Sequence, residues 1–206
     1  AKSYFMDRGR WVVEYTGARD VTITKSRLIG KPEVTAGKTH EYSAAQLWDV
    51  ATGQPKGRPL YHYYDRLVDV AISQDGRLAA TIAEAYVSKA SAVYIWNANN
   101  GERLHGPLPF NFATTREFSP DGILLAVGDH QGLVQVVDTS MGNMLDKTII
   151  MPPPIWELSF SNDGGSLAIG TGLSSSSSGC VEIIDLSTFR PRVERYSFED
   201  EMVSQL

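Results

Sequence analysis

Three segments of this chain carry the same turn at similar spacing, and no other feature constrains the fold as strongly. They are Ile72–Gly76 (ISQDG), Phe118–Gly122 (FSPDG) and Phe160–Gly164 (FSNDG), and their glycines are 46 and 42 residues apart. An Asp-Gly pair after an apolar strand favours a tight hairpin turn, because Gly adopts positive φ freely and Asp hydrogen-bonds to its own backbone. The sequence therefore predicts a repeat of about 40 to 45 residues.

A second marker follows each of these turns by roughly 20 residues, and a further copy follows a degraded fourth turn at Phe5–Gly9 and the extra residues of the first unit. The four copies are Leu47–Gly53, Ile95–Gly101, Val136–Gly142 and Ile183–Phe189. Each is a β-rich segment with an Asp or Asn at the end of the strand. Gly follows this residue by four positions in the first three copies, and Phe189 takes its place in the fourth. Apolar residues alternate between the markers, as strands require. We predict an all-β fold of four units with four short strands each. The domain covers residues 1–206, with an insertion in the first unit at about 16–42.

The Trp48-Asp49 dipeptide, the Ser-x-Asp-Gly turns and the segment LWDVATGQPKGRPL resemble the WD-repeat family, most closely its bacterial branch. The resemblance implies a β-propeller, in which four-stranded antiparallel blades circle a central channel. Many blades of that family carry a hydrogen-bonded His–Ser/Thr–Trp–Asp set. Here only one unit comes close, with His62, Thr81 and Trp96, while Ala90 takes the position of the Asp.

Four blades are the low end of the range for propellers. Segments at both ends of the chain, Ser3–Phe5 and Met202–Leu206, align with the innermost strand of the repeat. Two alternatives follow: a closed four-blade ring, or one half of a larger ring that a second copy or a longer chain completes. An open arc would expose unpaired strand edges, so we also expect self-association through the ends.

The charge balance and the single cysteine exclude several classes of partner. With 19 basic and 24 acidic residues, the net charge is −5, which argues against a nucleic-acid partner. Cys180 has no second cysteine for a disulfide or a metal site, which favours a reducing, cytoplasmic compartment. No apolar run approaches the roughly 20 residues of a membrane helix. We expect no membrane partner, no cofactor and no metal, and we interpret Asp69 and Glu157 as solvated channel residues.

Aromatic and basic side chains are concentrated just before one inner strand, in a predicted loop. Trp156 lies at the corresponding place in another unit, after three prolines. Because Tyr, Trp and Arg commonly anchor interfaces, we predict that a protein partner binds there. The predicted partner-binding residues of this region are Tyr63, Tyr64, Arg66 and Trp156. Packing between blades is the alternative role of Trp156.

Arg116 occupies a position that is Val70 or Leu158 in other units. A charged side chain on an inner strand must be paired or reach water. We therefore add Arg116 to the candidate partner contacts. The alternatives are an internal ion pair, with Glu117 or with a residue of a neighbouring blade, and a shift of the strand register by one residue.

The sequence shows no catalytic constellation. The four histidines, His40, His62, His105 and His130, fall in predicted loops, and no Ser lies in a nucleophile elbow. No His or Cys pair has the spacing of a zinc site. We predict a non-enzymatic interaction scaffold or regulatory domain that binds a protein partner through propeller loops. The alternative is a propeller accessory domain of a larger enzyme, such as a hydrolase, a peptidase or a kinase.

Overall fold

A computed structural model describes residues 2–6, 11–16, 42–49, 52–63, 65–85, 88, 90–172, 178–192 and 196–199. This part of the chain is all-β and contains no helix, hence none that is long and apolar enough to cross a membrane. Most of the expected insertion at 16–42 and the segment Met202–Leu206 lie outside the described residues.

The strands form four sheets in chain order, and every pairing is antiparallel. The first sheet is β1 (Lys2–Met6), β2 (Trp11–Thr16), β3 (Tyr42–Asp49) and β4 (Gln54–Tyr63). The second is β5 (Asp65–Ile72), β6 (Leu78–Ala85), β7 (Ser91–Asn97) and β8 (Glu102–Phe110). The third is β9 (Ala113–Phe118), β10 (Leu124–Asp129), β11 (Leu133–Asp138) and β12 (Asn143–Ile150). The fourth is β13 (Ile155–Phe160), β14 (Ser166–Gly172), β15 (Ser178–Asp185), β16 (Arg190–Pro191) and β17 (Tyr196–Glu199).

Four units of four strands are thus confirmed, with one difference in the fourth sheet. There β16 and β17 both pair with β15, so two short segments share the edge that a single outer strand occupies in the other sheets. Ser3–Phe5 lies in β1, the first strand of its sheet, which agrees with the repeat alignment.

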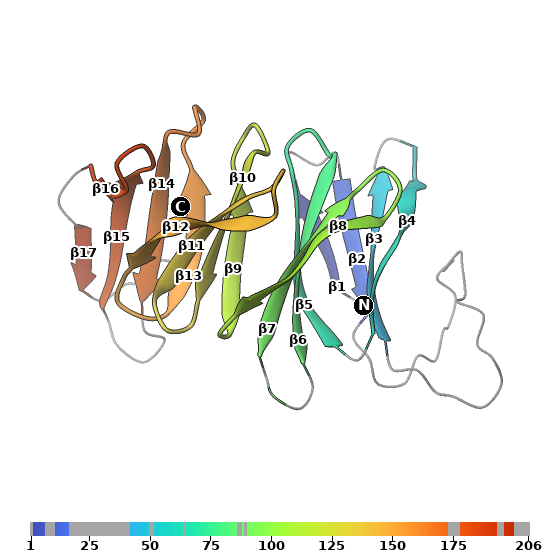
Figure 1. The fold of residues 1–206 in the computed structure, drawn as a ribbon, viewed down its shortest axis with the longest axis horizontal. Helices are drawn as coiled ribbons and strands as arrows, with labels where there is room; N and C mark the ends of the chain where they lie inside the picture. Colours follow the sequence, from blue (N-terminus) through green and yellow to red (C-terminus); the bar gives the residue numbers. More distant parts are fainter. Residues whose placement is uncertain are drawn as a thin grey trace.

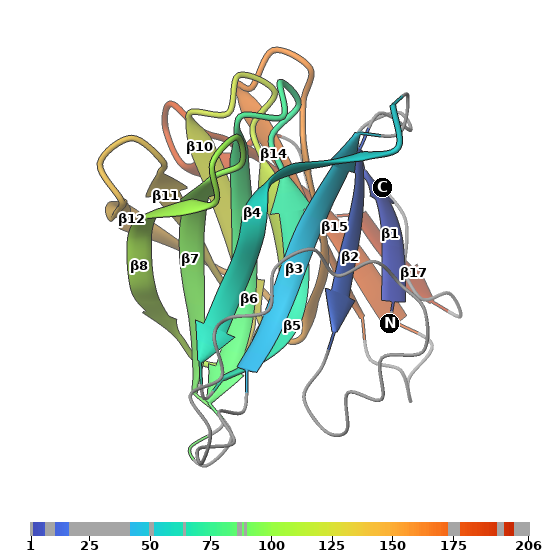
Figure 2. The same cartoon turned by 90° about the vertical axis from the view of Figure 1, so that its right-hand side faces the viewer.

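The sheets follow one another along the longest axis of the molecule (Figure 1). The first and the fourth sheets lie at opposite ends of this array, so the described strands do not form a closed four-sheet ring. Viewed from the end that carries the first sheet, β1 to β4 stand in front of the later sheets (Figure 2). The Ser-x-Asp-Gly turns line the upper edge in Figure 1, and the connections from each sheet to the next line the lower edge.

The three predicted turns have the same hydrogen bonds. In the first, the Ser73 hydroxyl donates to the Asp75 carboxylate (2.7 Å) and accepts from the N–H of Leu78 (2.9 Å). Gly76 closes the turn with a φ of 68°. The turns at Ser119 and Ser161 repeat this pattern. The hairpin prediction is therefore confirmed.

The second marker is also one structural motif. Asp49, Asn97, Asp138 and Asp185 each accept a hydrogen bond from a backbone N–H two or three residues later. Four residues after each of them the chain turns through the left-handed region. Gly supplies this conformation three times, and in the fourth copy Phe189 adopts it with a φ of 54°. An L-residue with a side chain is strained there.

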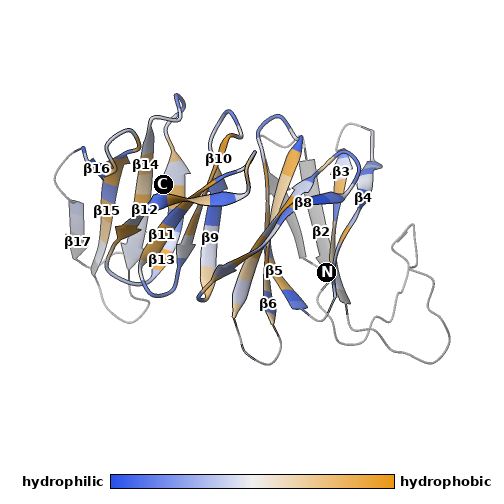
Figure 3. Cartoon of the chain, in the orientation of Figure 1, coloured by the Kyte–Doolittle hydropathy of each residue, from blue (hydrophilic) through white to orange (hydrophobic). Residues whose placement is uncertain are grey.

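Apolar side chains fill the space between successive sheets, and hydrophobic residues colour parts of most strands orange in Figure 3. Each of the three core clusters draws its residues from two neighbouring sheets. Representative buried members are Leu47 and Trp96 between the first and second sheets, Ile95 and Leu125 between the second and third, and Val136, Ile169 and Cys180 between the third and fourth.

The polar set of the second unit is only partly formed. The Trp96 indole N–H donates to the Thr81 hydroxyl at 2.8 Å inside the core. His62 contacts Trp96 edge to face, with ring centroids 5.3 Å apart, and its Nε2 makes no hydrogen bond. Burial, together with the nearby Arg103, lowers the pKa of His62 to about 4. His62 is therefore a neutral packing residue near physiological pH.

The first prediction concerns the positive φ of the repeated turn. Gly122→Ala should lower the free energy of unfolding by about 1–2 kcal/mol, because φ is 73° and an L-residue pays a steric penalty there. Gly165→Ala, in the neighbouring turn and without a positive φ, is the matched control and should change stability little. Urea unfolding of both variants measures the difference, and equal losses would contradict this account.

Candidate functional site

The connections that lead into β5, β9 and β13 lie along the lower edge of the molecule in Figure 1. We call this side of the molecule the connector face. Tyr63, the last residue of β4, and Arg66, near the start of β5, are both exposed there. Arg66 forms an ion pair with Glu84 at 2.5 Å. The predicted loop at this place is wrong in part, because β4 continues through Tyr63 and β5 begins at Asp65. Tyr64 lies outside the described residues.

Trp156 occupies a bulge on the same face. The strand register skips Trp156 in β13, and it skips the equivalent residues Val68 in β5 and Thr114 in β9. A bulge changes the direction of the side chain it carries. The Trp156 indole N–H donates to the carbonyl of Gly172, and the side chain is still 39% exposed. Its ring is thus both held and accessible.

Phe112 is a residue of this face that the sequence analysis missed. It lies between β8 and β9, half of it is exposed, and its backbone has a φ of 55°. Its carbonyl accepts a hydrogen bond from the N–H of His130 at 3.0 Å. Strained, exposed bulky residues are uncommon and are concentrated at functional sites. Positive φ at a phenylalanine has no sequence signal, so only the structure could reveal it.

The connector face therefore carries one accessible aromatic side chain at each of three successive connections. Tyr63, Phe112 and Trp156 are 51%, 50% and 39% exposed, and Ile150 adds an exposed aliphatic side chain between the last two. Large apolar side chains that are exposed at one end of a protein are a feature of interaction sites. The predicted residues Tyr63, Arg66 and Trp156 thus share a face.

Arg116 lies elsewhere, between the second and third sheets. Its guanidinium donates to the Asp69 carboxylate at 2.8 Å and to the carbonyl of Val70, both on β5. The side chains of Arg116 and Asp69 are 15% and 22% exposed, so the pair is largely buried. Of the alternatives for Arg116, the ion pair with a neighbouring sheet is the one that forms. A sequence alignment of units cannot show which neighbour supplies the partner.

Three carboxyl groups surround this arginine. Burial raises the pKa of Asp69, although Arg116 and the N–H of Val70 oppose the shift. Burial raises the pKa of Glu117 to about 7; Arg116 lowers it and Glu157 raises it. The pKa of Glu157 is also raised by burial and by Asp69, against the opposing charge of Arg116. Asp69 and Glu157, which we expected to be solvated channel residues, thus lie partly buried in one charged cluster with Arg116.

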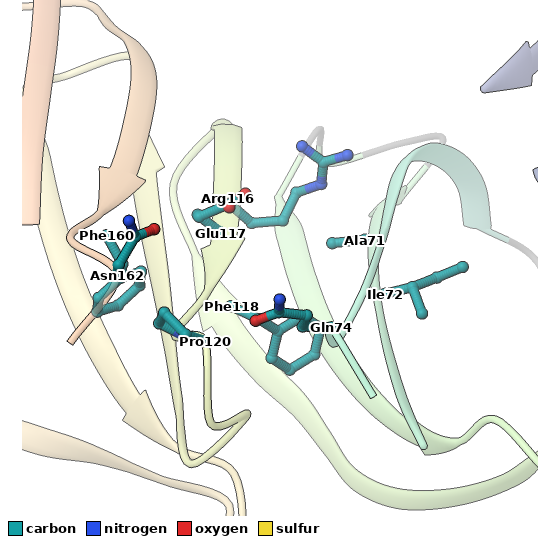
Figure 4. A pocket seen from close by; sticks show the side chains of 9 residues that line it. All are labelled: Ala71, Ile72, Gln74, Arg116, Glu117, Phe118, Pro120, Phe160 and Asn162. Atoms are coloured by element: carbon teal, nitrogen blue, oxygen red, sulfur yellow. The ribbon is translucent and has the colours of Figure 1, made fainter. Parts of the chain in front are cut away.

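A cleft of about 340 Å³ opens beside this cluster, on the side of the Ser-x-Asp-Gly turns (Figure 4). Arg116 and Glu117 form its charged wall, while Phe118, Phe160 and Pro120 form an apolar wall. The amides of Gln74 and Asn162 also lie along it. The described residues include no group of three or more His, Cys, Asp or Glu side chains that could hold a metal ion.

Two of the histidines are not where the sequence analysis placed them. His62 lies in β4 and His105 in β8, rather than in loops. Near the ends of these strands, Leu60 of β4 and Phe110 of β8 are buried in the clusters between sheets. His130 lies in the turn between β10 and β11, and His40 lies outside the described residues.

Comparison with known proteins identifies the fold and no more. No protein-family model matches the chain, and no curated protein is similar to it in sequence. The fold itself is widespread, since 919 chains of solved structures match it. One of them belongs to hydrazine synthase of Kuenenia stuttgartiensis, with a TM-score of 0.61 and 16% sequence identity. The match covers 84% of this chain and 54% of that chain, so this chain spans about half of its length.

The second prediction concerns the Arg116–Asp69 ion pair. Arg116→Leu should lower the free energy of unfolding by about 2–3 kcal/mol, somewhat less than the roughly 3–5 of a fully buried pair, because it leaves Asp69 without its partner. Adding Asp69→Asn should recover most of the loss, since Leu158 already fills the equivalent position in the fourth sheet. Urea unfolding of the single and double variants measures both changes in the free energy of unfolding. A double variant no more stable than Arg116→Leu would rule out the unpaired charge as the cause.

The third prediction concerns Glu117. Its pKa rises from 4.5 to about 7 on folding, so the folded protein holds this proton more tightly than the unfolded chain. The associated stability is fully present below pH 4.5 and is lost as the pH rises through about 7. Glu117→Gln should therefore unfold at a less pH-dependent temperature than the wild type between pH 5 and pH 8. Solvent at the mouth of the cleft screens part of the effect. Unfolding temperatures that change with pH by the same amount in the two proteins would contradict the raised pKa of Glu117.

Proposed function

We propose that this chain is a non-enzymatic binding domain of the WD-repeat type, and that it holds a protein partner on the connector face. In this proposal the four sheets are blades of a β-propeller. The repeated Ser-x-Asp-Gly turns, the four matching Asp or Asn turns and the hydrogen bond from Trp96 to Thr81 support this interpretation. The two kinds of turn have the same geometry from unit to unit, whereas the Trp96–Thr81 hydrogen bond belongs to the second unit.

The observation that carries the proposal is the row of Tyr63, Phe112 and Trp156 on three successive connections. Aromatic rings bury a large area for few rotatable bonds, so they commonly supply most of the binding energy of an interface. Phe112 keeps its strained backbone although its ring is exposed, which is expected of a residue whose orientation serves binding. The net charge of −5 favours a protein over a nucleic acid as the partner. With its one cysteine buried, we place the domain in the cytoplasm.

The second candidate function is an accessory domain of a larger enzyme. The similarity to 54% of a hydrazine synthase chain supports it, because there the same arrangement of sheets is part of a longer chain in a protein that is named as an enzyme. In this case the connector face would contact a catalytic domain rather than a separate protein. The same surface is used in both proposals, and they differ in where the partner lies.

The fourth prediction tests the connector face. We expect the triple variant Tyr63→Ala, Phe112→Ala, Trp156→Ala to bind the partner at least about 100-fold more weakly, since each ring of a binding centre contributes roughly 1–2 kcal/mol or more. The partner is first isolated from an extract of the source organism on immobilised wild-type protein, and its affinity is then measured with purified components. Circular dichroism verifies that the variant is folded.

The matched control is Ile123→Ala with Met141→Ala. These side chains are as exposed as the three aromatic residues, but they lie on turns at the opposite end of the molecule. The control should bind the partner as the wild type does. Equal losses in the two variants, or undiminished binding by the triple variant, would rule out the connector face. An isolated partner that is a catalytic subunit would favour the accessory-domain alternative.

A further inference from the structure

One face of the fourth sheet repeats the residues that are buried between sheets elsewhere. In the second and third sheets, the centre of the face that points toward the next sheet is apolar and covered. Six of its residues have no exposed surface: Ala80, Val93 and Ile95 in the second sheet, and Ala126, Val134 and Val136 in the third.

The strand register identifies the matching residues in the fourth sheet. Ala168 pairs with Ile183, just as Ala80 pairs with Ile95 in the second sheet. Because paired residues of an antiparallel sheet point to the same side, Ala168 and Ile183 share the face that continues the series.

The next pair along the same strands also matches the pair at the corresponding place in another sheet. Gly170 pairs with Val181, as Gly128 pairs with Val134 in the third sheet. A Cβ at Gly128 would lie 2.6 Å from Ile155 of the fourth sheet, so a glycine at this position allows the following sheet to approach closely. The fourth sheet carries the same glycine at Gly170.

These positions are not fully covered in the fourth sheet. Ala168, Val181 and Ile183 are only partly buried. Tyr196 pairs with Val181 and is 55% exposed, whereas Ile149, which pairs with Val134 at the matching place, is 6% exposed. We call the surface formed by Ala168, Val181, Ile183 and Tyr196 the outer patch. Its composition is that of a sheet-to-sheet interface.

The first sheet has the complementary side. Ala45 and Leu47 of β3 pack toward the second sheet, so Trp48 points away from it. Trp48 corresponds to Trp96, which packs against the preceding sheet and is 5% exposed. Trp48 is only partly buried. The two ends of the array thus present the two halves of the junction that joins each sheet to the next.

We propose that a second copy of this chain covers the outer patch with its first sheet, and that two copies form one ring of eight sheets. Each copy then supplies a fourth sheet to one junction and a first sheet to the other, so a two-fold axis completes both. Junctions between unlike surfaces form closed rings when the rotation between units closes. The new junctions continue the packing already present between neighbouring sheets. This inference rests on the proposal that the sheets are propeller blades and not on the partner of the connector face.

Light scattering after size-exclusion chromatography tests the ring. The wild type should have twice the chain mass of 22.6 kDa over a wide range of concentration. Ile183→Arg puts a charge into both junctions and should weaken the dimer at least about 100-fold. Met141→Arg is the control, because Met141 is 72% exposed on a turn away from the patch, and it should leave the dimer intact. A monomeric wild type, open polymers, or a dimer that withstands Ile183→Arg would each overturn the proposal.

A mixing experiment tests which surfaces meet. Ile183→Arg and Trp48→Arg should each yield monomers that are folded by circular dichroism. In a mixture of the two, one junction carries both substitutions and the other carries none, so a heterodimer should form. No heterodimer between folded variants would overturn the pairing of fourth with first sheet. The connector-face triple variant should still dimerise, which separates this result from failure of the proposed function.

Discussion

Both faces of a sheet in this chain are apolar, so each sheet requires a neighbour on either side. Ile95 and Trp96 are adjacent in β7, point to opposite faces, and are both buried. An antiparallel sheet with one polar face can end a fold against water, whereas an apolar face that stays uncovered costs free energy. The stack of sheets follows from this constraint, and the repeated turns keep the geometry of each junction the same. The same constraint leaves partly exposed apolar side chains on the first and fourth sheets.

The Arg116–Asp69 pair is the exception within this stack. At the position where Val70 and Leu158 fill the space between sheets with apolar groups, the third sheet inserts a guanidinium. The pair compensates the buried charge, while burial, with a smaller contribution from Glu157, raises the pKa of Glu117 against the effect of Arg116. The cleft beside it combines this charged group with the apolar side chains of Phe118 and Phe160. The connector face, by contrast, owes its aromatic side chains to the connections and not to the junctions.

Much of the architecture could be predicted from local signals. The Ser-x-Asp-Gly turns depend on residues within five positions of each other, and all three have the expected hydrogen bonds. The predicted loop around Tyr63 failed because β4 is extended by contacts of His62 with the rings of Tyr94 and Trp96 in the next sheet. Phe112 was missed for a related reason: its positive φ depends on how two sheets are joined, which a residue type does not encode.

By itself, the amino-acid sequence determined the all-β class, the number of units, the positions of the turns and the fact that Arg116 needs a partner. These features depend on residues close together in the chain or on composition, whose physical preferences can be read locally. Only the tertiary structure decided that Asp69 is that partner, that Tyr63, Phe112 and Trp156 share one face, and that the outer patch is left partly uncovered. Each of these depends on which strands of different sheets lie opposite each other, and that is settled by packing over the whole array.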